Sequence, residues 1–323
     1  MSGMPAVRRV FRFFMKMTRE KPIRVGGQAV IEGVMMRSLD YVAVAVRKAD
    51  GIIVLKKDRF VSLTKRKRFL GFPLIRGAVT LIESLVLGIR ALNFSSRIAM
   101  SEHDGKETGK PDRPEWQQAL MTGGTLLLSL MFGFFLFFYI PLILTEFTGI
   151  RDGVLFNLID GGIRLSIFLL YLGLISLWKD IRRFFEYHGA EHKSIFAFEA
   201  GSPLTLEGVK AFTTHHPRCG TSFLLIVMLV SILVFMLLGR PEGIQQRLLR
   251  FLFIPVIGGI SYEIILLSTQ KYGRALAAVL TVPGLWLQRI TTKDPDEKQI
   301  EVALVALKAA LGMETDATVE PAG

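Results

Sequence analysis

The chain of 323 residues has one cysteine, Cys219, and therefore no intrachain disulfide. Charged residues make up only 21% of the sequence against 50% hydrophobic residues, and the mean hydropathy is +0.41. This balance fits poorly with a disordered chain and with an ordinary water-soluble fold. The sequence also lacks a P-loop, a dinucleotide-binding fingerprint, an internal repeat and a recognisable nucleic-acid-binding module. Nucleic acid is therefore not an expected partner.

Long apolar segments dominate what is present. A helix needs about 20 apolar residues to cross about 30 Å of hydrocarbon. Four segments meet or approach this length: residues 119–145, 162–178, 221–239 and 249–268. We therefore expect a mainly α-helical, multi-pass protein of the cytoplasmic (inner) membrane, with the lipid bilayer as its partner. Arg164, near the start of the second predicted span, is expected to extend to the membrane surface and to need no role.

Basic residues are distributed unevenly along the chain. Residues 1–76 hold 18 Lys and Arg against 5 Asp and Glu, whereas the remaining residues hold 22 against 23. Because Lys and Arg beside spans concentrate on the cytoplasmic side, we expect both termini and the loop 179–220 in the cytoplasm. Residues 1–23 are expected to form a basic amphipathic tail that contacts anionic lipid, or else a disordered basic tail.

The rest of the chain predicts a small soluble part around the four-span domain of residues 119–289. Residues 24–70 are expected to form a cytoplasmic β element, because β-rich runs flank Asp50-Gly51, a pair typical of a hairpin turn. Residues 71–118 are expected to hold an interfacial or bundle-packed helix over 77–94 and then a polar loop. The segment 273–287 is too short to span. Residues 290–323 predict a soluble C-terminal helix and tail.

A histidine cluster marks the loop 179–220, where four of the five histidines fall within 29 residues. His188, Glu191 and His192 form an H-x-x-E-H pattern. On a helix the two histidines stand at i and i+4, so their imidazoles share one face. The same order occurs in the inverted zinc-protease motif, in which two histidines bind Zn²⁺ and the glutamate activates water. Glu191 is therefore the candidate catalytic base.

A third ligand is available in the motif that follows. His215, His216 or Cys219 could join His188 and His192, which would leave the fourth zinc position open for catalysis. We therefore expect His188, His192, His216 and Cys219 to be the metal ligands. The alternative is a purely structural network, in which these side chains form a hydrogen-bonded cap between the spans.

Two further carboxylates are candidates. Glu263 lies within an apolar segment, where a carboxyl group is expensive and is by default a functional-site hypothesis. Glu32, between glycines at 27 and 33, is a possible additional base or ligand. The glycines around it predict a backbone that turns tightly or is approached closely.

Several motifs together resemble a known family. They are GGQAVIEGVMMR from Gly26, YHGAEHKSI from Tyr187, HPRCGTSF from His216, SYEII from Ser261 and DPDEKQIEVAL from Asp294. In this order they are similar to the bacterial YqhQ-like family, a domain of unknown function often labelled a metal-dependent enzyme. The resemblance implies an integral membrane protein of bacteria. The motif positions it carries over are Glu32, His188, Glu191, His192, His216, Cys219 and Glu263, with His215 less secure.

The combined evidence favours a metal-dependent membrane enzyme, a hydrolase, in which Glu191 activates water beside a histidine-bound zinc ion. The alternative is a non-enzymatic transport or assembly factor, in which the His/Glu network holds the loop 179–220 against the bundle. The membrane position of Glu263 favours the alternative, whereas the histidine cluster favours the enzyme.

Overall fold

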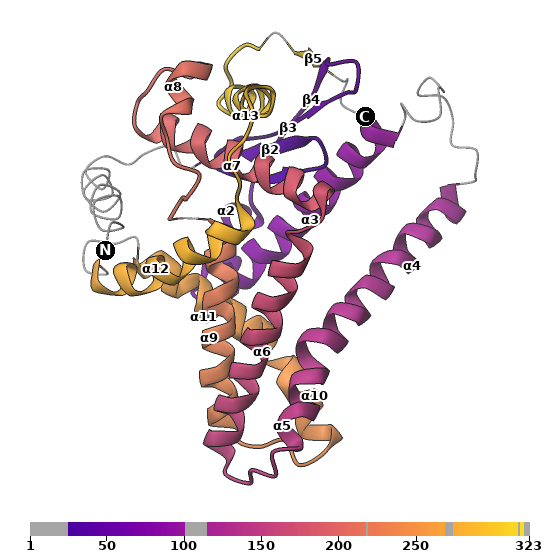
Figure 1. Cartoon of the computed structure of the whole chain (residues 1–323), viewed down its shortest axis with the longest axis vertical. Helices are drawn as coiled ribbons and strands as arrows, with labels where there is room; N and C mark the ends of the chain where they lie inside the picture. Colours follow the sequence, from indigo (N-terminus) through magenta and orange to yellow (C-terminus); the bar gives the residue numbers. More distant parts are fainter. Residues whose placement is uncertain (1–24, 101–114, 218, 269–273, 316, 320–323) are drawn as a thin grey trace.

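The computed structural model describes residues 25–100, 115–217, 219–268, 274–315 and 317–319. The predicted basic tail over 1–23 and the polar stretch 101–114 lie outside the described residues. Figure 1 shows two parts: a layer of strands and helices at the top and an elongated set of apolar helices beneath it.

The layered part is built on a five-stranded sheet in the order β1-β2-β3-β4-β5. β1 to β4 run antiparallel, and β5 pairs in parallel with β4. The predicted hairpin is present between β3 and β4, where Gly51 has a φ of 91° that costs glycine little. The strands are β1 (Gly26–Val30), β2 (Gly33–Arg37), β3 (Tyr41–Arg47), β4 (Ile53–Arg59) and β5 (Thr318–Val319).

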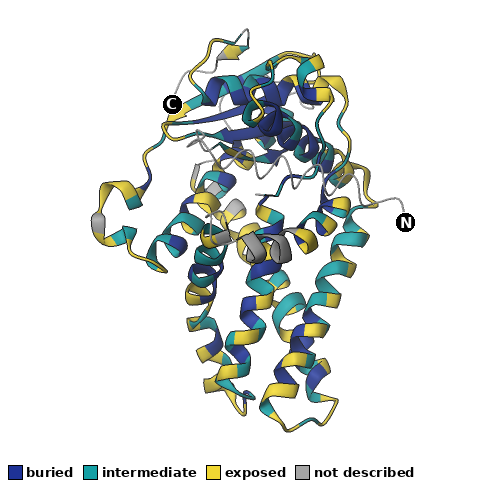
Figure 2. Ribbon diagram, turned by 90° about the vertical axis from the view of Figure 1, so that its left-hand side faces the viewer, coloured by how far each residue is buried: buried dark blue, intermediate teal, exposed yellow. Residues whose placement is uncertain are grey.

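Both faces of this sheet are buried, which explains the almost continuous apolar sequence of β3. Ala43 and Ala45 face α7 (Lys179–Glu199) and α13 (Glu297–Ala310). The alternating valines of β3 face α3 (Ile75–Met100) on the other side. Figure 2 shows the resulting concentration of buried residues in this layer. The segment 179–220 is therefore not a loop throughout, because α7 and α8 (Leu206–Lys210) belong to it.

Within the described residues, four helical stretches are long and apolar enough to cross a membrane, as predicted. They are Gly123–Glu146, Gly153–Ile175, Gly220–Leu238 and Ile244–Leu267. The first combines α4 (Glu115–Phe134), the π-helical turn η2 (Phe135–Tyr139) and α5 (Ile140–Glu146). The second and third are α6 (Gly153–Ile175) and α9 (Gly220–Leu238), and the fourth combines α10 (Ile244–Leu252) with α11 (Ile254–Ser268).

The second span starts nine residues earlier than predicted and is not short. Asp152 caps α6 by accepting a hydrogen bond from the Leu155 N–H at 2.7 Å. Arg164 consequently lies eleven residues inside the helix, only 6% exposed, and pairs with Asp160 at 2.7 Å. The expectation that Arg164 reaches the membrane surface was therefore wrong.

Two longer helices, α3 and α12 (Arg274–Thr291), connect the layer of strands to the bundle. The short helices α2 (Leu63–Arg66) and η1 (Arg68–Gly71) lead from the sheet into α3, which contacts α11 near its start and the sheet near its end. α12 lies across the top of the bundle beside α9 (Figure 1), and Gly284 packs directly on Ser222 of α9.

Candidate metal site

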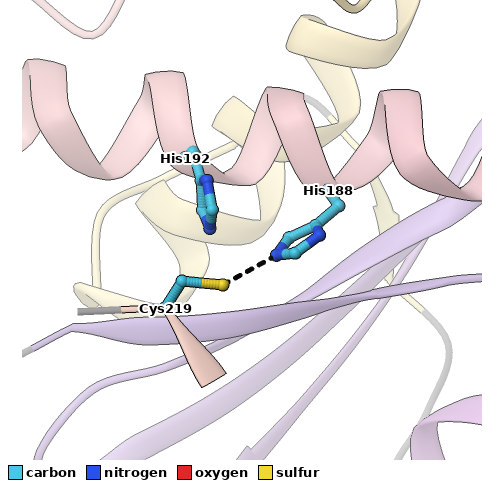
Figure 3. A group of neighbouring side chains, drawn as sticks. All are labelled: His188, His192 and Cys219. Atoms are coloured by element: carbon cyan, nitrogen blue, oxygen red, sulfur yellow. Dashed lines mark hydrogen bonds between the residues drawn. The ribbon is translucent and has the colours of Figure 1, made fainter. Parts of the chain in front are cut away.

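The candidate site lies where α7 of the soluble layer meets the start of α9. His188, His192 and Cys219 each present one ligand atom, and these three atoms lie within 4.8 Å of one another. Nε2 of His188 is 3.2 Å from Sγ of Cys219. Figure 3 shows both imidazoles projecting from the same face of α7 toward the sulfur. The i, i+4 spacing of the histidines produces this arrangement.

Backbone carbonyl groups determine which ring nitrogen faces the site. Nδ1 of His188 lies 2.8 Å from the Thr291 carbonyl oxygen, and Nδ1 of His192 lies 2.5 Å from that of Thr214. Because a carbonyl oxygen only accepts, each Nδ1 must donate, and each neutral ring then keeps its lone pair on Nε2. Among the described residues, Nε2 of His192 has no hydrogen-bond partner. Metal-binding histidines are commonly oriented in this way.

The pKa values of His192 and Cys219 also favour binding of a metal cation. Burial lowers the pKa of His192 to about 4, so the imidazole is neutral near pH 7. Burial opposes ionisation of Cys219, but the interaction with His192 and the hydrogen bonds with Thr221 outweigh it and hold the thiol pKa below its usual value. A neutral imidazole and a readily ionised thiol are the forms that bind a metal ion.

Glu191 is buried beside these groups. Burial raises its pKa to about 8, and the neighbouring Cys219 adds to the increase, while His188 and a hydrogen bond from the Gly27 N–H oppose it. Among the described residues its Oε2 has no hydrogen-bond partner. β1 reaches this carboxyl group because Gly27 lacks a side chain: a Cβ there would lie 3.0 Å from Cγ of Glu191.

His216 packs beside His192, with the ring centroids 5.7 Å apart, but it is not one of the three clustered ligands. Its Nε2 lies 3.3 Å from Oε2 of Glu199, and the two side chains are 5% and 1% exposed. Its backbone N–H donates to the side-chain oxygen of Gln288 at 2.7 Å. Burial lowers the pKa of His216 to about 3. The structure therefore brings Cys219, and not His216, to the two histidines of α7; His215 contacts Thr213 instead.

The two remaining predicted residues have ion-pair partners elsewhere. Glu32 occupies the β1–β2 turn with a φ of 51° and accepts hydrogen bonds from Arg183 and from Tyr187. Glu263 accepts two hydrogen bonds from Arg76, at 2.7 and 2.5 Å. Neither carboxylate belongs to the three-residue group.

Two comparisons place the chain among known proteins. Residues 72–313 match the family described as a protein of unknown function, DUF1385. The chain belongs to this family. It is 33% identical over 307 residues to uncharacterized protein YqhQ of Bacillus subtilis (strain 168), which covers 91% of this chain and 94% of the relative. The resemblance to the YqhQ-like family is thereby confirmed. No solved structure matches the chain.

The site also depends on residues that sequence reasoning missed. The matched family region includes the three clustered side chains and the two carbonyl partners, Thr214 and Thr291. These carbonyl groups give no signal in the sequence, because every residue has one. Glu199 was missed as well, since a single acidic residue near the end of a helix usually faces solvent.

Proposed function

We propose that this family member is a metal-dependent membrane hydrolase that holds one divalent ion, preferably zinc, between His188, His192 and Cys219. The observation that carries the proposal is the convergence of two correctly oriented Nε2 atoms and one sulfur within 4.8 Å. Two imidazoles and a thiolate form a donor set that zinc accepts, and three protein ligands leave a fourth position open, as in catalytic sites. The bound ion would polarise a carbonyl or phosphoryl group and acidify water.

Glu191 would act as the base in this reaction. Its unpartnered, buried Oε2 can accept a proton from water, and the Gly27 N–H holds the carboxyl group in place. A nearby cation lowers the pKa of a carboxyl group, so the bound ion would favour the ionised form of Glu191 near neutral pH. This arrangement separates the ligands from the base, as the H-x-x-E-H pattern predicts.

The location of the site favours a substrate that reaches it at the membrane surface. Cys219 is the N-cap of α9, so the candidate ligand directly precedes a span. His188 and His192 come from a helix that packs on the sheet. A substrate bound here would contact both the soluble layer and the bundle.

The second candidate function is non-enzymatic. The same side chains join α7, the start of α9 and the end of α12, and the His216–Glu199 pair adds a buried connection. A metal ion or a hydrogen-bonded network in this position would fasten the soluble layer to the bundle, as an assembly or transport factor requires. Catalysis needs the Glu191 carboxylate as a base, whereas a fastening role would use Glu191 only as a packing and hydrogen-bonding group of the network.

Metal content of the purified full chain tests the first part of the proposal. The wild type should carry about one zinc ion per chain, the number a single three-ligand site holds. His192→Ala and Cys219→Ser should lose it. His215→Ala is the matched control, because it removes a histidine of the same segment whose Nδ1 lies 3.3 Å from the Thr213 hydroxyl and which is outside the three-residue group. Equal metal content in His192→Ala and wild type would overturn the metal site.

Glu191→Gln separates catalysis from fastening. The variant keeps the shape of the side chain but removes the base, so metal content should stay near that of the wild type. Hydrolysis of ester, amide and phosphoester substrates by the protein in lipid nanodiscs should fall by about 10²-fold or more. Retained metal and retained activity would exclude Glu191 as the base. Loss of thermal stability equal to that of His192→Ala would instead favour the fastening role.

A further inference from the structure

A second feature of the molecule lies at the opposite end of the bundle from the metal site. A cavity of about 480 Å³ opens between the π-helical turn of the first span, α6 and α10. Its walls are mainly apolar, with Phe134, Phe138 and Leu142 among them. Three arginines also line it: Arg164, Arg247 and Arg250. We call it the arginine pocket. A pocket of this size can hold part of a small amphiphilic molecule.

The positive charge in the arginine pocket exceeds the negative charge that accompanies it. Arg164 and Arg250 are 6% and 3% exposed. Asp160 pairs with Arg164 at 2.7 Å, whereas Arg250 donates to two neutral oxygens, the side-chain oxygen of Asn157 at 2.7 Å and the Gly239 carbonyl at 2.9 Å. Among the described residues, two buried guanidinium groups therefore share one buried carboxylate. An excess charge in an apolar environment is costly unless an anion accompanies it.

Arginine N–H groups without acceptors in the described part of the chain also indicate that the pocket binds an anion. Among the described residues, Nε of Arg164 has no hydrogen-bond partner although it is buried. Nε of Arg247 is likewise buried without a hydrogen-bond partner among these residues, whereas its Nη2 donates to Glu146. One oxygen of Asp160 is also without a partner, so the carboxylate does not saturate the donors around it. Arg164 also stacks on Phe138, 4.5 Å from the ring centre, and an aromatic ring gives its Nε–H no oxygen acceptor.

The depth of the Arg250 guanidinium suits a lipid phosphate. Arg250 reaches the Gly239 carbonyl just beyond the end of α9, and Asn157 lies four residues inside α6. At 1.5 Å per residue that is about 6 Å from the helix start, close to the boundary between head groups and hydrocarbon. Guanidinium groups bind phosphate oxygens strongly because their donors match them in pairs.

An adjacent apolar surface can accept the rest of a lipid. Above the arginine pocket, α4 diverges from α6 (Figure 1). Its side chains there are exposed, including Leu127 at 60% and Leu130 at 70%. An acyl chain whose phosphate sits between Arg164 and Arg250 would extend along this face. We propose that the arginine pocket binds the phosphate group of an anionic lipid, with its chain packed along α4.

Lipid retention by the full chain tests this proposal. The protein in detergent is titrated with phosphatidylglycerol, phosphatidylcholine of the same chain length, or inorganic phosphate, and bound molecules are counted by native mass spectrometry. We expect at least about tenfold tighter binding of phosphatidylglycerol than of phosphatidylcholine, or 1.4 kcal/mol. Equal binding of the two lipids would overturn the proposal. Binding of inorganic phosphate as tight as that of phosphatidylglycerol would overturn the assignment to a lipid.

Two kinds of variant locate the binding. Arg250→Gln should abolish the preference for phosphatidylglycerol, but the loss of a buried cation could also unfold the bundle. Leu248→Trp fills the pocket from a 59% exposed position and leaves all three arginines in place. It should reduce phosphatidylglycerol binding about tenfold. The matched control is Leu237→Trp, at an 89% exposed position of α9 outside the pocket. Unchanged binding by Leu248→Trp would overturn the proposal.

Discussion

At the residue scale, Gly189 determines how closely the candidate metal site is assembled. It lies between His188 and Ala190 on α7, where the chain between α12 and α13 passes. A Cβ at Gly189 would lie 2.0 Å from the Lys293 carbonyl oxygen, closer than any real contact. The Lys293 N–H also donates to the Phe185 carbonyl at 3.0 Å. This close approach brings the Thr291 carbonyl within reach of His188.

Gly189→Ala should therefore weaken metal binding without removing a ligand. The new methyl group displaces the segment that carries Thr291, and His188 loses the acceptor that orients its ring. Loss of such a partner typically lowers metal affinity about 10- to 100-fold. Competition with a chelator in detergent measures the affinity. Gly173→Ala is the control, because a Cβ there meets nothing within 4 Å. Wild-type affinity in Gly189→Ala would contradict this account.

At the element scale, an ion pair attaches α3 to the fourth span. Arg76, in the first turn of α3, donates twice to Glu263 of α11. The backbones are close at the same place, since a Cβ on Gly77 would lie 3.0 Å from Cα of Gly259. Glu263 thus has a neighbouring cation from a helix that is not among the four candidate spans. This ion pair explains how the Glu263 carboxylate can be accommodated within an apolar segment.

Arg76→Ala should lower the free energy of unfolding by about 1–2 kcal/mol, because it leaves Glu263 unpaired. A third of the Arg76 side chain is exposed, which keeps the effect below that of a fully buried pair. Adding Glu263→Gln should recover part of the loss, since the unpaired charge is then absent. Thermal unfolding in detergent measures both. Arg182→Ala, on a side chain 67% exposed, is the control and should change little. Equal stability of the single and double variants would exclude the pair as a stabilising contact.

At the scale of the whole molecule, the two proposed sites lie at opposite ends of the bundle. The metal site lies beside the soluble layer, and the arginine pocket lies near the loops 147–152 and 239–243. The excess of Lys and Arg in residues 1–76 predicts that the soluble layer is cytoplasmic. The arginine pocket would then face the outer leaflet.

Single-cysteine labelling tests this orientation, and the chain suits it because Cys219 is its only cysteine and is buried. Glu207 and Glu242 are both exposed, the first in the soluble layer and the second between α9 and α10. In intact cells a membrane-impermeant maleimide should label Glu242→Cys and leave Glu207→Cys unlabelled until the membrane is opened. The unsubstituted chain should stay unlabelled in both conditions. The reverse pattern would mean that the topology is inverted.

Much of the fold was predictable because it depends on local patterns. Four long apolar runs predicted four spans, and Asp50-Gly51 predicted the β3–β4 hairpin. The bounds were less predictable, because helix ends are determined by capping. Asp152 extends the second span to Gly153 and so places Arg164 inside the bundle. β5 could not be predicted, because two residues have no pattern and pair with β4 only after α13 brings them there.

The sequence by itself determined the class of the protein and the side chains on one face of α7, because apolar runs and the i, i+4 spacing act within a single helix. Which residue joins His188 and His192 was decided only by the tertiary structure. His216 and Cys219 lie three residues apart and were equal candidates in the sequence. The N-terminus of α9 presents Cys219 to the two imidazoles, while Glu199 and Gln288 hold His216 beside His192 but outside the three-ligand group. This choice depends on how α7, α9 and α12 pack together, and that packing is determined by contacts between residues far apart in the chain.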